Sequence, residues 1–181
     1  MDIQTIYQNT LKYSTAKHQS ISQTIPGTNL PYVVHLSNVA MEILIASIYT
    51  ANFDLELAIQ VALLHDVMED TPTTYEELKV KFGKQVADAV SALTKNIQLP
   101  KEAQMADSLY RISGQPHEIW SVKLADRITN LQKPPSHWSN EKKIKYHAEA
   151  RTILDALVSG NAYLSARLSS KIAEYKNYLE F

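Results

Sequence analysis

Apolar residues recur along most of the chain at the spacing of one face of an α-helix. In residues 36–47 they are separated by three and four positions, which places them on one side of a helix. The same spacing returns in residues 86–93, 120–131 and 164–179. No segment sustains the alternation of apolar and polar residues that marks a half-buried strand. The pattern therefore predicts an all-α fold, a compact bundle of several helices.

One helix is expected to lie deeper than the others. Residues 55–67, LELAIQVALLHDV, are apolar on most sides, as in a helix buried in the middle of a domain. Gly83 separates two shorter helices, and Asn161 after a glycine is expected to open the last one. Residues 19–31 and 132–140 are polar and rich in turn formers, so they are predicted as loops.

Composition and charge exclude several classes of protein. The 181 residues carry 18 Lys and Arg against 19 Asp and Glu, too little positive charge to hold a nucleic acid or an acidic membrane face. No run of about 18 apolar residues occurs, and the first residues lack the apolar stretch of a secretory signal. Without cysteine there is no disulfide or thiolate metal site. We expect one cytoplasmic domain spanning residues 1–181, with no nucleic-acid or membrane partner.

The glycines restrict how this chain could bind phosphate. Only four are present, and each stands alone in the sequence. The sequence therefore contains neither a dinucleotide-binding GxGxxG turn nor a P-loop. If the protein acts on a phosphate compound, a metal ion or individual side chains must hold it.

Residues 63–71, LLHDVMEDT, place four ionisable side chains after an apolar run. His65 and Asp66 are neighbours, about 100° apart on a helix, which still lets both reach one ion. If the helix continues for another turn, Glu69 and Asp70 lie above them at i+4. Such groups are costly to bury without a cation or partners. On spacing alone, a metal site and a carboxylate cluster in solvent are equally good interpretations.

A second polar feature lies in the segment VKLADRITN. Asp126 interrupts an otherwise apolar helix face, with Arg127 and Asn130 within one turn. An aspartate inside a helix is unfavourable unless something holds it. A salt bridge to Arg127 or Lys123 explains it more simply than metal binding. His35 precedes an amphipathic helix, where a lone histidine is usually structural.

Taken together, these segments resemble the HD-domain metal-dependent phosphohydrolases. Within that family the resemblance is to the hydrolase domain of RelA/SpoT proteins and to the small alarmone hydrolases. It runs from about Tyr13 to about Leu157 and depends on the order and spacing of its motifs. The segments that carry it are PYVVH at 31–35, ALLHDVMEDTPTTYEEL at 62–78, FGKQVADAVSALTK at 82–95 and VKLADRITN at 122–130.

The resemblance implies one divalent metal ion held by side chains from three distant segments. The implied ligands are His35, His65, Asp66 and Asp126. Two imidazoles and two carboxylates suit Mn²⁺, the ion expected in this family, and leave Zn²⁺ and Fe²⁺ open on ligand type. Glu69 and Asp70 match the family's acidic pair, whose implied role is to orient and deprotonate the water that attacks phosphorus.

The resemblance also implies a reaction. Alarmone hydrolases remove the 3′-pyrophosphate from guanosine tetra- or pentaphosphate, releasing pyrophosphate and GDP or GTP. The side chains expected to contact a nucleotide substrate here are Asn130, Lys142, Tyr146 and Arg127. Two simpler interpretations stay open, namely helix packing for Tyr146 and a solvated surface position for Lys142.

The loop before His35 departs from the family pattern. Relatives carry an Arg-Lys pair there, and the matching positions are expected near Thr24 and Ile25, but residues 19–34 contain neither Arg nor Lys. The nearest candidates to replace the lost charge are Lys17, His18 and Lys101; otherwise His18 is expected to be a surface or packing residue.

This departure leaves the substrate open between several classes. Adenosine 3′-pyrophosphates, (p)ppApp, compete with (p)ppGpp. The chain could also be an HD-superfamily phosphohydrolase acting on a different nucleotide, or a non-catalytic HD sensor that binds one.

Overall fold

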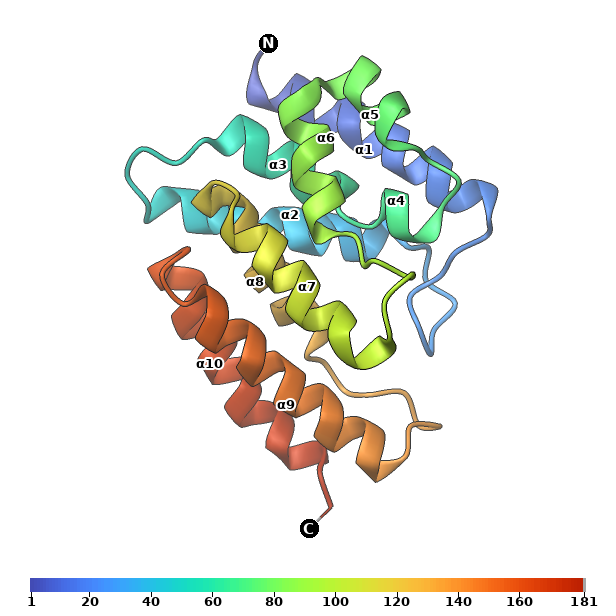
Figure 1. Ribbon diagram of the computed structural model, residues 1–181, viewed down its shortest axis with the longest axis vertical. Coiled ribbons are helices and arrows are strands. Elements are labelled where there is room, and N and C mark those ends of the chain that lie inside the picture. Colours follow the sequence, from blue (N-terminus) through green and yellow to red (C-terminus); the bar gives the residue numbers. More distant parts are fainter. Residues whose placement is uncertain (181) are drawn as a thin grey trace.

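The computed structural model describes residues 1–180, which form helices joined by short loops (Figure 1). Within these residues no strand forms, and the pair Thr24 and Pro31 makes an isolated bridge. The prediction of an all-α fold is confirmed. The helices are α1 (Ile3–Ser20), α2 (Val33–Ile48), α3 (Leu55–Leu64), α4 (Val67–Asp70), α5 (Tyr75–Phe82), α6 (Lys84–Leu93), α7 (Lys101–Ser113), α8 (His117–Asn130), α9 (Asn140–Leu157), α10 (Ala162–Tyr175) and the 3₁₀ turn η1 (Lys176–Tyr178).

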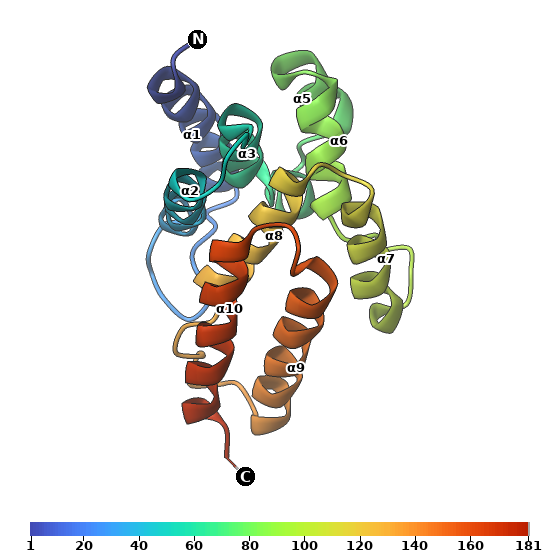
Figure 2. The ribbon, with the colours of Figure 1, turned by 90° about the vertical axis from the view of Figure 1, so that its left-hand side faces the viewer.

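Helix α8 lies at the centre of the molecule. It contacts α2 and α3 on one side, α6 and α7 on another, and the antiparallel pair α9 and α10 (Figure 2). Its apolar face is fully buried at Leu124 and packs in one core with Leu36 of α2 and Leu63 of α3. Because α2, α3 and α8 meet in this core, polar side chains on their inner faces are brought close together. No helix within residues 1–180 is long and apolar enough to cross a membrane.

Local sequence signals explain how the last helices begin. Asn161 caps α10, accepting a hydrogen bond from the Leu164 backbone N–H at 3.0 Å, as its position predicts. Its side-chain amide also donates to Thr50 Oγ1 at 2.8 Å, which ties α10 to the end of α2. At Gly160 a Cβ would lie 2.6 Å from the Cβ of Trp120, so the turn between α9 and α10 packs directly on α8.

The long helix expected over residues 55–67 is interrupted. α3 ends at Leu64, and the separate turn α4 begins at Val67. His65 and Asp66 occupy the break, and their side chains bond to other parts of the chain rather than continuing the helix surface. The apolar pattern runs through this break because Val67 is as fully buried as Leu63 and Leu64 at the end of α3.

An ion pair between α2 and α10, with the carboxylate buried and the guanidinium partly exposed, gives a test of the packing. Glu42 is 2% exposed, and Arg167 reaches its carboxylate through Nε at 2.6 Å from Oε2 and Nη2 at 2.6 Å from Oε1. Removing one partner leaves a buried charge uncompensated. We expect Arg167→Ala to lower the free energy of unfolding by about 2 kcal/mol in urea titrations, the range of hydrogen bonds to a charged group. A loss under about 0.5 kcal/mol, the usual range of a surface change, would contradict this account.

Candidate metal centre and cleft

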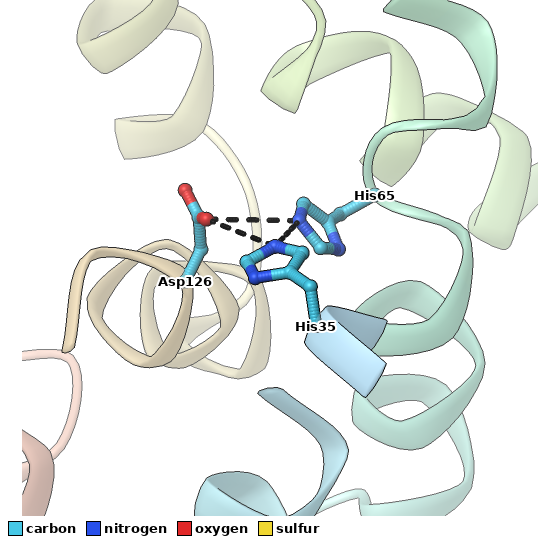
Figure 3. Close-up of side chains that lie close together, drawn as sticks. All are labelled: His35, His65 and Asp126. Atoms are coloured by element: carbon cyan, nitrogen blue, oxygen red, sulfur yellow. Dashed lines mark hydrogen bonds and ion pairs between the residues drawn. The ribbon is translucent and has the colours of Figure 1, made fainter. Parts of the chain in front are cut away.

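Three helices bring two imidazoles and a carboxylate together in the core. His35 lies in the first turn of α2, His65 at the end of α3 and Asp126 inside α8, and the three side chains point toward one another (Figure 3). The Nε2 atoms of His35 and His65 are 3.2 Å apart. Asp126 Oδ1 lies 3.6 Å from the first and 3.7 Å from the second. All three residues are buried, so their polar atoms face one another rather than water.

Asp66 completes this group. Its Oδ2 is 2.9 Å from His65 Nε2 and 3.7 Å from His35 Nε2, and it also accepts a hydrogen bond from the Tyr32 hydroxyl. Two donors that bind one ion at about 2.1 Å are about 3.0 Å apart at a right angle and about 3.4 Å apart in a tetrahedron. The observed separations lie around these values. His35, His65 and Asp126 therefore fit a divalent ion in both chemistry and spacing, and Asp66 lies within reach of both imidazoles.

Hydrogen bonds on the outer side of each imidazole fix its orientation. His65 Nδ1 lies 2.8 Å from the Ala62 carbonyl and must donate to it, so Nε2 faces the centre and offers a lone pair to an ion once its own proton is displaced. His35 Nδ1 lies 3.4 Å from the hydroxyl of Thr129, which itself donates to the Asp126 carbonyl at 2.9 Å. Both Nε2 atoms can thus act as ligands facing the centre, an arrangement common in metal-binding histidines.

The charges of the centre favour a bound cation. Burial opposes the ionised form of Asp66, but the adjacent His65 holds the pKa of this carboxyl below its usual range. For Asp126, Lys123 and the histidines likewise outweigh burial and lower its pKa. Burial lowers the pKa of His35, while the carboxylates outweigh burial and raise that of His65. Both carboxyls thus favour the ionised form, Asp126 in the core and Asp66 partly exposed at its edge.

A cleft of about 540 Å³ opens beside this centre, and Glu69 and Asp70 of α4 line it. Glu69 is held by Lys95, whose Nζ lies 2.5 Å from Oε1 and whose backbone N–H donates to Oε2 at 3.1 Å. Asp70 Oδ2 accepts a hydrogen bond from Gln23 Nε2 at 2.7 Å. Burial raises the pKa of Asp70. Each member of the acidic pair is therefore held by a different partner.

The sequence of the chain matches a known protein family. The sequence profile of a family described as HD domain matches residues 10–159. The chain belongs to the HD-domain family.

Individual relatives match this HD domain over most of the length of both chains. It is 34% identical over 170 residues to the guanosine-3′,5′-bis(diphosphate) 3′-pyrophosphohydrolase MESH1 of Danio rerio, covering 91% of each chain. The enzyme of the same name from Drosophila melanogaster is 28% identical, with 90% of each chain covered. A solved structure described as a metazoan ortholog of SpoT that hydrolyses ppGpp superimposes with a TM-score of 0.80 at 28% identity, over 96% of this chain and 97% of the other. The resemblance given by the motifs is confirmed.

Of the four side chains expected to contact the substrate, three line the cleft and one does not. Asn130 donates to Asp126 Oδ1 at 2.5 Å and lines the cleft. Arg127 also lines it and packs 4.3 Å from the centre of the Tyr146 ring, which borders the cleft too. Lys142 lies outside the cleft wall, with its Nζ 4.2 Å from the centre of the Trp138 ring, and it is exposed.

The positively charged side chains that line the cleft do not come from the loop before His35. They are Lys95, Lys101, Lys123 and Arg127, from the end of α6, from α7 and from α8. Lys123 is bound to Asp126 at 3.1 Å, and Lys17 pairs with Glu77 at 2.6 Å outside the cleft wall. Of the residues considered as replacements for the missing basic pair, Lys101 lines the cleft. Lys95 was missed because a lysine just after a helix has no distinctive spacing.

A second cavity of about 330 Å³ adjoins the cleft between the two predicted loops. Asn130 and Tyr146 line both cavities. The loops touch where Gly27, with φ +79°, packs against Pro135, so that a Cβ at Gly27 would lie 3.0 Å from the proline ring. The second cavity also has Trp138 in its wall, which makes it suited to a flat apolar group.

Proposed function

We propose that this HD domain is a Mn²⁺-dependent nucleotide 3′-pyrophosphohydrolase that degrades (p)ppGpp or (p)ppApp. The observation that carries the proposal is the meeting of two histidines and two aspartates beside a cleft that also holds an acidic pair and four cations. The names of the similar enzymes from Danio rerio and Drosophila melanogaster support a 3′-pyrophosphohydrolase. The cytoplasmic location expected from the sequence is part of the same proposal.

The metal ligands and the acidic pair have separate roles in this proposal. His35, His65, Asp66 and Asp126 would hold the ion, which supplies positive charge for the phosphoryl oxygens and makes water easier to deprotonate. Glu69 accepts a proton from the attacking water, and Asp70 orients that water. Lys95 contacts both oxygens of Glu69 and so fixes how this carboxylate faces the cleft.

The reaction consumes one water molecule. Its oxygen bonds to the phosphorus attached to the 3′ oxygen of the ribose, and the bond between that phosphorus and the 3′ oxygen breaks. Glu69 takes one proton from the water, and this proton passes on, directly or through solvent, to the leaving 3′ oxygen, which becomes a hydroxyl. The products are pyrophosphate and GDP, GTP, ADP or ATP.

The rest of the substrate is proposed to span both cavities. Lys101 is exposed on the cleft wall and can pair with phosphate oxygens. Asn130 and Tyr146 lie where the two cavities meet, and Arg127 positions the Tyr146 ring. The base would enter the second cavity. Lys142 stays a predicted contact that requires its ammonium to leave the Trp138 ring.

The test is digestion of ppGpp and ppApp side by side with added Mn²⁺, with the products separated by anion exchange. We expect pyrophosphate together with GDP or ADP, and the faster reaction identifies the preferred base. Release of orthophosphate would instead identify a phosphomonoesterase acting on another nucleotide. Tight nucleotide binding with metal bound and no product over hours would favour a non-catalytic sensor.

The proposed ion should stabilise the fold. An ion that binds only the folded state at 100 times its Kd adds about 2.7 kcal/mol to the free energy of unfolding. We expect Mn²⁺ added to chelator-treated protein to raise the melting temperature, and Asp126→Ala to remove the rise. Zn²⁺ and Fe²⁺ in parallel titrations rank the competing ions. An unchanged melting temperature at saturating Mn²⁺ would contradict the proposed site.

A further inference from the structure

Gln23 bridges two groups that are distant in the sequence. Its side-chain Oε1 lies 2.6 Å from His18 Nδ1, and its Nε2 donates to Asp70 Oδ2 at 2.7 Å. Its backbone is fixed as well, because its N–H donates to the His18 carbonyl at 3.1 Å and its carbonyl accepts from the Tyr32 N–H at 3.3 Å. Gln23 is therefore held at both backbone and side chain, although it lies in a loop.

The chemistry of the partners fixes the direction of each bond. An ionised Asp70 is only an acceptor, so Gln23 must turn its NH₂ group toward it. The Gln23 oxygen then faces His18, whose Nδ1 must carry a hydrogen. His18 is 1% exposed, its Nε2 has no partner among residues 1–180, and burial lowers its pKa. These surroundings fit a neutral imidazole protonated at Nδ1.

We propose that Gln23, oriented by His18, is a positioning residue for Asp70. The pair holds Oδ2 in place, and Oδ1 makes no hydrogen bond to a side chain described here, so it is free to act in the cleft. An amide does this without neutralising the carboxylate, whereas a cation at position 23 would form an ion pair with it. The inference deepens the proposed function, because it rests on Asp70 orienting the attacking water.

The proposal accounts for a loop that lacks Arg and Lys. Gln23 lines the cleft from that loop and contacts the acidic pair, so the loop supplies orientation rather than charge. His18 then has a specific role behind the cleft, in place of the simple packing role expected for it. Its ring lies 4.7 Å from that of Tyr32, which in turn bonds to Asp66.

Kinetics of Gln23→Met test the proposal, because methionine keeps the length of the side chain and loses both hydrogen bonds. We expect kcat to fall by about tenfold, the range of one hydrogen bond to a charged group, with KM changed less than about twofold. The matched control is Gln19→Met, an exposed position that lines the cavity behind the loop and not the cleft. It should keep the activity of the unaltered protein.

A double-mutant cycle separates positioning from direct contact with the substrate. If Gln23 acts through Asp70, Gln23→Met should have no further effect in the Asp70→Asn protein. The same tenfold fall in both backgrounds would overturn the proposal, as would an unchanged kcat in Gln23→Met alone.

A measurement that does not depend on catalysis tests this inference separately from the proposed function. Nitrogen NMR of labelled histidine should show His18 protonated at Nδ1, and Gln23→Met should speed the exchange of that proton with water. A His18 protonated at Nε2 would overturn the inference even if the enzyme is active. Failure of the unaltered protein to release pyrophosphate would instead overturn the proposed function, whatever the NMR result.

Discussion

Asp66→Ala is expected to abolish both metal binding and turnover. Its Oδ2 lies 2.9 Å from His65 Nε2 and 3.7 Å from His35 Nε2, so its loss removes a proposed ligand and one of the two carboxylates beside the histidines. A metal ion contributes several kcal/mol to phosphoryl transfer, so turnover should fall by about 10³-fold or more. Metal content after gel filtration and pyrophosphate release measure the two effects.

The control for this variant is a distant aspartate. Asp155→Ala changes an exposed residue at a small cavity between α9 and α10, and it should keep both metal and activity. Circular dichroism establishes that the Asp66 variant remains helical. A folded Asp66→Ala protein with full metal content would show that the ion is held without this carboxylate.

Glu69→Ala is expected to separate chemistry from metal binding. Glu69 bonds to Lys95 and is not one of the four side chains that converge on the centre, so metal content should be unchanged. Loss of a general base typically costs about 10²- to 10⁴-fold, and this fall should appear in kcat. Single-turnover release of pyrophosphate at saturating Mn²⁺ measures it.

Two further variants sharpen the interpretation of Glu69. Lys95→Met keeps the carboxylate but removes the ammonium that holds it, so a smaller fall in kcat is expected. Glu76→Ala, at an exposed position of α5, is the control that should leave kcat unchanged. Full turnover in Glu69→Ala would remove the role proposed for this residue.

Much of the fold was predictable because a helix that packs one side against a core carries an apolar stripe. The stripes in residues 36–47 and 120–131 became inner faces of α2 and α8, and Asn161 capped α10 as expected. The interruption at His65 was not predictable from this pattern. The apolar run of residues continues through Val67. The helix ends before His65 because the side chain of His65 contacts His35 of α2 and Asp126 of α8, and the sequence gives no sign of these contacts.

The candidate site depended on information beyond local spacing. His35 and His65 are 30 positions apart, and the packing of α2 and α3 on α8 brings them beside Asp126. The resemblance to a family named these residues, whereas spacing alone left a salt bridge as the simpler account of Asp126. The contact between Gln23 and Asp70 spans 47 positions and has no local signal.

The acidic pair lies on α4, a single turn of four residues that begins directly after His65 and Asp66. So short a helix has little stability of its own and keeps its shape through its surroundings. The placement of Glu69 and Asp70 relative to the proposed ion therefore depends on the side chains packed around this turn and not on the helix itself.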